Sequence, residues 1–252
     1  MMVTFFSSRI RLVVLEASIV LRRSSLVLAS VGLLSWSTAC NSAVFSPPAR
    51  VLPLESAATL PRGDIGIQAE GAGSGAAFGV SALSGTIRAR RGMSENLDGS
   101  VEATLVRIGG DPAADVNRSV VATRVGAKYR VLPSLALTGG LGGGGSAAGG
   151  FMSPDVGAIV AWENRYVVPF ASVRGGLSQP IGATSVDVTR RGDPIGTNVG
   201  TPKLTWLVSG SAGLRVPIAK WSVLGGVGVT HLADVRDKET VISLGGGVEA
   251  VF

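Results

Sequence analysis

His231 is the only histidine in the sequence and the residue best suited to acid–base chemistry. Two carboxylates, Asp234 and Asp237, follow it closely. A histidine oriented by a carboxylate can act as a general base, but such a site also needs acidic residues from other segments. The sequence shows no set of residues that we can match to this arrangement. We therefore predict no catalytic residue, and we expect His231 to be a polar residue at the rim of the fold.

Cys40 is the only cysteine, and it stands where an export signal would be cut. Two arginines precede an apolar run at 26–34, and small residues fill most of 35–39. This order is typical of a secretory signal peptide, and the run is shorter than the roughly 20 residues of a membrane-spanning helix. We predict a signal helix over 1–39. The cut site resembles the lipobox of bacterial lipoproteins, which implies lipidation of Cys40, although an ordinary cleavage with an incidental cysteine stays open.

Other common kinds of chemistry find little support. One histidine and one cysteine supply no typical zinc ligand set, so no metal site is predicted. The run Gly139–Gly150 has the glycine spacing of a nucleotide loop, but neither Lys-Ser/Thr nor a helical pattern follows it. Without residues 1–39 the chain carries 19 basic and 16 acidic residues, with no Lys/Arg-rich run. We predict no cofactor and no nucleic-acid partner.

The elements that would position these residues are strands. Only 16% of the residues are charged, against about 25% in an average protein, and 36 of the 252 are glycine. In the last segment, Ile242, Leu244 and Val248 fall on one face, while Ser243 and Glu249 fall on the other. Similar segments of about ten residues, long enough to cross a bilayer at a tilt, recur at 64–73, 77–91, 97–108, 118–131, 134–145, 155–163, 166–177, 204–216, 221–232 and 240–252.

The connections between these segments alternate in length. Short ones fall at 92–96, 132–133, 164–165 and 217–220, and longer ones at 109–117, 146–154, 178–203 and 233–239. Short turns on one side and long loops on the other are typical of membrane barrels, as are aromatic residues at the boundary. The aromatic residues beside the short turns are Tyr129, Trp162, Tyr166, Trp221 and Phe252. We predict an all-β fold over 64–252: an antiparallel up-and-down transmembrane β-barrel of about 10 strands (8–12). Residues 40–63 are expected to be a lipid-anchored or flexible periplasmic linker.

Two motifs carry a resemblance to bacterial outer-membrane β-barrels. One is the terminal strand that ends in Gly-Val-Glu-Ala-Val-Phe252, and the other is the turn Gly92-Met-Ser-Glu-Asn followed by an alternating strand. The resemblance implies a location in the cell outer membrane, with Phe252 as a signal read by the outer-membrane assembly machinery. It also implies outer-membrane lipids and lipopolysaccharide as partners. The oligomeric state stays open.

Charged residues fall on the face of the strands that would line the lumen. They are Arg88, Arg90, Asp98, Glu102, Arg124, Lys128, Arg130, Arg215 and Glu249. Charges inside a barrel must pair or stay hydrated, so they predict either a salt-bridged, closed lumen or a small basic pore. In the loop 178–203, the residues Asp187, Arg190, Arg191 and Asp193 are candidate contacts for lipopolysaccharide phosphates.

Three functions follow from this pattern. The first is a non-catalytic outer-membrane barrel with a structural or surface-interaction role. The second is a narrow pore or small-ligand carrier with a basic lumen. The third is a soluble, β-rich lipoprotein that faces the periplasm.

Overall fold

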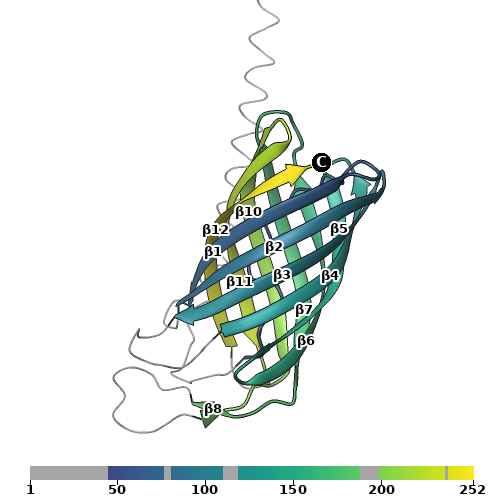
Figure 1. Cartoon of the computed structure of the whole chain (residues 1–252). Coiled ribbons are helices and arrows are strands. Elements are labelled where there is room, and N and C mark those ends of the chain that lie inside the picture. Colours follow the sequence, from purple (N-terminus) through teal and green to yellow (C-terminus); the bar gives the residue numbers. More distant parts are fainter. Residues whose placement is uncertain (1–44, 77–80, 110–118, 188–198, 236–237) are drawn as a thin grey trace, which may run out of the picture. The chain divides into compact units, whose positions relative to one another are not determined.

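Ten strands form a closed antiparallel barrel in a computed structural model, which describes residues 45–76, 81–109, 119–187, 199–235 and 238–252 (Figure 1). Each strand pairs with its neighbour in sequence, and the first strand pairs with the last to close the ring. The strands are β1 (Ile65–Ala76), β2 (Ser81–Ser94), β3 (Leu97–Gly109), β4 (Ser119–Leu132), β5 (Leu135–Ser146), β6 (Gly149–Ala161), β7 (Val168–Ile181), β10 (Thr205–Ile218), β11 (Trp221–Ala233) and β12 (Lys238–Val251). Between β7 and β10, β8 (Val186–Asp187) and β9 (Val199–Gly200) pair separately.

The predicted fold class and strand order are confirmed; most strand boundaries differ by four residues or fewer, and one is wrong by six. The sixth strand begins at Gly149 and not at residue 155, so the expected long connection 146–154 is a turn at 147–148. Gly143, Gly144 and Gly145 pair there with Met152, Phe151 and Gly150. Glycine has no side chain to mark a face, so the period of two cannot be read through this stretch.

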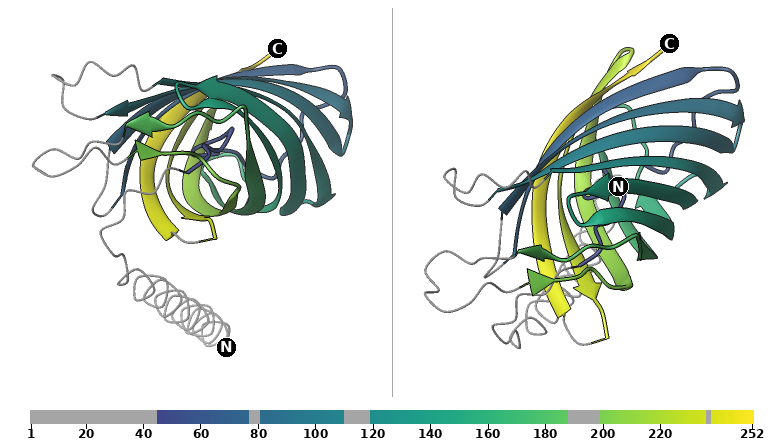
Figure 2. Two further views of the ribbon diagram at one scale, coloured as in Figure 1. Left: turned by 90° about the horizontal axis from the view of Figure 1, so that it is seen from below. Right: turned by 60° about the horizontal axis from the view of Figure 1, so that its bottom comes forward.

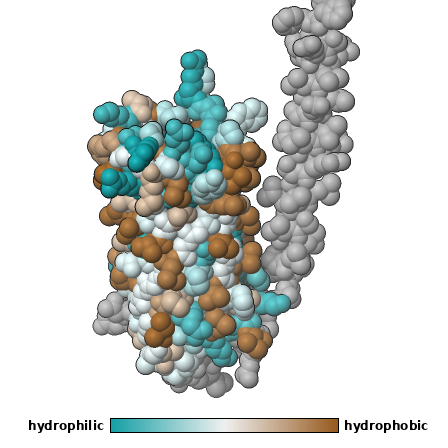
Figure 3. Space-filling model, turned by 90° about the vertical axis from the view of Figure 1, so that its right-hand side faces the viewer, coloured by the Kyte–Doolittle hydropathy of each residue, from teal (hydrophilic) through white to brown (hydrophobic). Residues whose placement is uncertain are grey.

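Alternation along each strand separates an apolar exterior from a filled interior. In β4, Val121 and Val125 are each 57% exposed, whereas Ala122 and Arg124 between them are buried. Figure 3 shows brown and pale residues over one side of the barrel wall and hydrophilic residues gathered at one end. Soluble proteins rarely present so continuous an apolar exterior.

The two ends of the barrel differ. The short-turn end, at the top of Figure 1, carries the C-terminus and the connections 95–96, 133–134, 162–167 and 219–220. The long-loop end carries the connections 77–80, 110–118, 147–148, 182–204 and 234–237. Trp221 marks the short-turn end and Trp206 the other, since Trp206 lies twelve residues before Ile218, the partner of Trp221. That separation corresponds to about 40 Å along the strand and about 30 Å across a membrane.

Residues 45–60, called here the threaded segment, run through the interior of the barrel. Figure 2 shows this segment in dark blue within the ring of strands. Leu54 and Ala57 in its middle are 1% and 0% exposed. The flexible linker expected over 40–63 is therefore wrong for these residues, which contact the inner faces of strands all round the wall.

Candidate functional site in the barrel lumen

An ion-pair network fills part of the lumen. Each of its charged groups contacts at least one group of opposite sign within 4 Å. On the described part of the chain, six cations and six carboxylates of the network are nearly buried: Arg50, Arg88, Arg90, Arg124, Lys128 and Arg174, with Glu55, Glu70, Asp98, Glu102, Asp155 and Glu249. A seventh cation, the more exposed Arg215, joins the network at its edge through Glu249. Because the nearly buried charges are equal in number, this inner part of the network needs no ion from outside to be neutral.

Glu55 of the threaded segment is the hub of this network. Its carboxylate lies 2.9 Å from Arg50, 3.3 Å from Arg88 on β2 and 3.3 Å from Arg174 on β7. Arg50 reaches Glu102 on β3 at 3.0 Å. Strands β2 and β7 are not neighbours in the ring. The threaded segment thus ties together parts of the wall that make no hydrogen bonds to each other.

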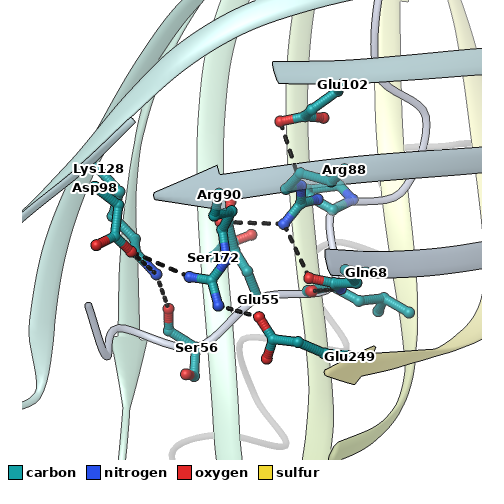
Figure 4. Close-up of polar contacts among 12 residues, drawn as sticks. Glu55, Ser56, Gln68, Arg88, Arg90, Asp98, Glu102, Lys128, Ser172 and Glu249 are labelled. Atoms are coloured by element: carbon teal, nitrogen blue, oxygen red, sulfur yellow. Dashed lines mark hydrogen bonds and ion pairs between the residues drawn. The ribbon is translucent and has the colours of Figure 1, made fainter. Parts of the chain in front are cut away.

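The remaining charges pair around this hub. Arg124 binds Asp155 in a two-pronged contact, at 2.7 Å from Nε and 2.8 Å from Nη2. Figure 4 shows Arg90 between Asp98 and Glu249, and Lys128 beside Asp98. Arginine presents donors in a planar fork that fits a carboxylate, which makes such pairs specific in geometry. The wall therefore fixes each charge in one place.

An apolar cluster fills another part of the lumen. Leu52, Leu54 and Ala57 of the threaded segment belong to one buried cluster with wall residues of β5, β6, β7 and β11. The wall residues are Ala136, Ile159, Ala161, Val168, Phe170 and Leu224. The threaded segment therefore contacts the wall through both ion pairs and apolar packing, and β6 and β7 contribute residues to both the network and the cluster.

Glycines on the inner face leave room for these contacts. A Cβ atom at Gly142 would lie 2.2 Å from Cβ of Ala49, and one at Gly228 would lie 2.6 Å from Leu52 Cδ1. A Cβ atom at Gly140 would lie equally close to the guanidinium of Arg124. The glycine-rich run from Gly139 thus fits a close approach to the segment and the buried arginine, as glycine in strands often does.

Little space remains in the lumen at this level. The cavity lined by Arg50, Arg90, Glu102 and their neighbours has a volume of about 10 Å³. That is about the minimum that holds one water molecule. This cavity is therefore too small for a solute larger than a water molecule.

Most of the charges predicted to face the lumen do so. Arg88, Arg90, Glu102, Arg124, Lys128 and Glu249 are all buried inside the wall. Two others lie nearer the short-turn end. Arg215 is 18% exposed and contacts Glu249 at 3.4 Å, and Arg130 binds the side chain of Asn96 in the β2–β3 turn.

The other predicted sites lie on the rims or outside the described residues. His231 is exposed near the long-loop end, with Nδ1 3.1 Å from the hydroxyl of Thr240. Phe252 is 66% exposed at the short-turn end, where its backbone pairs with Ile65. Asp187 belongs to β8, with its side chain not described, and Arg190, Arg191, Asp193 and Cys40 lie outside the described residues, as does the predicted signal helix over 1–39.

Five charged residues of the network were missed from the sequence: Arg50, Glu55, Glu70, Asp155 and Arg174. Arg50 and Glu55 carried a usable signal, since they are the only charged residues in 41–60, a stretch otherwise made of apolar, small and neutral polar residues. A mobile solvated linker is usually richer in charge. Opposite charges five residues apart in such a stretch indicate a buried segment with partners.

No group of three or more His, Cys, Asp or Glu residues in the described part of the chain could hold a metal ion. No helix in that part is long and apolar enough to cross a membrane.

Comparisons with known proteins give similarity of a general kind. No family model and no curated protein sequence matches the chain. Among solved structures, it is similar to Neisserial surface protein A, with 13% identity, 74% of this chain and 95% of the other covered, and a TM-score of 0.38. It is also similar to the β domain of the Bordetella autotransporter BrkA, with 12% identity, 75% of this chain and 98% of the other covered, and a TM-score of 0.42. An outer-membrane channel from Pseudomonas putida F1 is similar with 12% identity, 81% of this chain and 100% of the other covered, and a TM-score of 0.42. At these identities and TM-scores, the similarities carry no argument about function.

Proposed function

We propose that this protein is a non-catalytic β-barrel of the bacterial outer membrane, with a structural or surface-interaction role and a closed lumen. The apolar exterior carries the proposal. Ile87 on β2, Val156 on β6 and Leu244 on β12 are 63%, 69% and 66% exposed, and β6 lies across the ring from β2 and β12. Lipid is the solvent that such a surface fits, and a ring without edge strands satisfies every backbone group within it.

The same features weigh against both alternatives. A soluble lipoprotein of the periplasm would leave this apolar surface in water, where it promotes association. A narrow pore or small-ligand carrier with a basic lumen needs an open path and unpaired cations. In the described lumen, the six nearly buried cations are matched by six carboxylates, and the cavity among them has a volume of about 10 Å³.

Heat modifiability of the membrane-extracted protein tests the proposal. We expect the protein to stay in the membrane pellet after carbonate washing and to run faster on a gel when it is not boiled. Planar bilayers that contain it should show no steady conductance. Release by carbonate without a heat shift would favour the soluble lipoprotein, and steady conductance would favour the pore.

The proposed partners follow from the location. They are outer-membrane lipids around the wall, lipopolysaccharide at the long loops with Arg190 and Arg191 as candidate contacts, and the assembly machinery at Phe252. We also propose that Cys40 is lipidated and anchors the mature chain. A mass spectrum of the mature N-terminus checks this, because an unmodified Cys40 or a cut elsewhere contradicts it.

A further inference from the structure

The threaded segment has a defined direction, which its contacts fix at both ends. At its start, Phe45 bridges to Lys203, beyond the long-loop end of β10. The amide of Ser46 donates to Thr205 Oγ1 at 3.0 Å, and the two hydroxyls of Ser46 and Ser178 lie 2.8 Å apart. Thr205 opens β10 and Ser178 lies near the end of β7, so both mark the long-loop end.

At the other end, the segment is held by the short turns. The amide of Leu60 donates to Asp98 Oδ1 at 2.9 Å, and the hydroxyl of Thr59 donates to the carbonyl of Glu95 at 2.7 Å. Glu95 belongs to the β2–β3 turn, and Asp98 lies two residues into the strand that follows it. The segment thus crosses the whole barrel from the long-loop end to the short-turn end.

The length of the segment agrees with this crossing. The fourteen steps from Ser46 to Leu60 could span up to about 46 Å if fully extended, against a barrel height of about 30 Å. Three prolines, Pro47, Pro48 and Pro53, keep the segment extended and out of a helix. It does not double back, because hydrogen bonds of Ser46, Pro53 and Leu60 fall in that order along the barrel.

We infer that the chain enters the barrel from the outer face, so that the part of the mature protein before Phe45 is presented at the cell surface, beside the long loops. The inference rests on the proposed function, because it needs the long loops to face outward. The short turns and the C-terminus would then face the periplasm. The cavity of about 10 Å³ beside the segment leaves no room for a second crossing of the chain.

The consequence is a display surface built from two parts of the chain. Any group that the chain carries five residues or fewer before Phe45 is within about 17 Å of it, which is less than the roughly 30 Å of membrane hydrocarbon. Such a group therefore stays on the outer side. The surface that partners meet comprises the long loops together with the N-terminal end.

An epitope tag inserted directly before Phe45 tests the inference on whole cells. Two matched proteins carry the same tag after Thr184, in the long loop, or after Ala219, in the short turn. Heat modifiability first shows that each tagged barrel is folded. We expect antibody to bind intact cells with the first two tags equally, and the third tag only after the cells are permeabilised.

The outcomes separate the inference from the proposed function. If the tag after Thr184 is reached on intact cells but the tag before Phe45 is not, the inference is overturned and the proposed function stands. If the tag after Thr184 is itself hidden until permeabilisation, the proposed function and orientation are wrong.

A cross-link checks the threading without a tag. The pair Ser46→Cys with Ser178→Cys should form a disulfide, because their hydroxyl oxygens are 2.8 Å apart. The pair Ser46→Cys with Ser222→Cys, at opposite ends of the barrel, should not. Each single cysteine variant serves as a control, because it shows any disulfide that the new cysteine forms with Cys40. A disulfide between positions 46 and 222 would mean that the segment runs in the opposite direction. No disulfide between positions 46 and 178 would contradict the proposed path.

Discussion

Glu55→Gln is the substitution that tests the threaded segment most directly. Glutamine has nearly the same shape, so the change removes a charge and leaves the packing in place. The glutamate contacts three arginines, Arg50, Arg88 and Arg174, at 2.9 to 3.3 Å. Without it, the six nearly buried cations of the described lumen would face only five nearly buried carboxylates.

The size of the effect follows from the partners that remain. Breaking a buried ion pair by removing one partner costs about 3–5 kcal/mol. Here each arginine keeps another carboxylate: Arg88 keeps Glu70 at 2.9 Å and Arg174 keeps Asp155 at 3.5 Å. We therefore expect the free energy of unfolding to fall by an amount near the lower end of this range, about 3 kcal/mol. For a domain of this size, that corresponds to a fall of about 6–12 °C in the unfolding midpoint.

The assay is the temperature at which the folded band disappears on an unboiled gel, measured in detergent micelles. Glu95→Gln in an exposed turn is the matched control and should leave the midpoint unchanged. The double variant Arg50→Met with Glu55→Gln removes one charge of each sign, so it should regain part of the loss. If Glu55→Gln unfolds at the same temperature as Glu95→Gln, the segment is not packed in the lumen as we describe.

Three further predictions concern the wall. Leu244 is 66% exposed and lies midway between the aromatic belts, so Leu244→Arg should lower the free energy of unfolding by about 2–4 kcal/mol, and Val248→Arg near the boundary by much less. Equal losses for the two variants, measured by urea titration of the protein refolded in vesicles, would contradict the membrane placement. Gly142→Ala should lower the unfolding midpoint, because its Cβ would lie 2.2 Å from that of Ala49, while Gly175→Ala, with nothing within 4 Å, should not. Phe252→Asp should reduce the amount of heat-modifiable protein in the outer membrane and Phe252→Tyr should not; equal amounts of the two would argue against Phe252 as an assembly signal.

The barrel itself could be predicted because its strands carry a periodic signal. In β4, Val121 and Val125 alternate with Arg124, and the same period returns in most strands. The signal fails where glycine removes the side chains that define it. For that reason the start of β6 at Gly149 was missed.

The threaded segment and the pairing within the lumen could not be predicted in the same way. An extended segment inside a barrel has no repeating face, so Pro47 and Pro53 suggested only a linker. The inward direction of Arg90 and Glu249 follows from the strand period, but their contact does not, since it joins residues 159 positions apart. Such a pairing depends on strand tilt and register, which a single sequence does not reveal.

The threaded segment also has a consequence for the order of assembly. The ring is closed by its first and last strands, for instance through Gly66 beside Val251. Chains very seldom pass through closed rings, and the threaded segment carries Glu55 to Arg88 on β2 and Arg174 on β7 inside the closed wall. The strands must therefore curl around the segment before β12 meets β1. The N-terminal stretch then serves as a template for the curvature of the sheet, and contacts of such long sequence separation make the final closure a slow step.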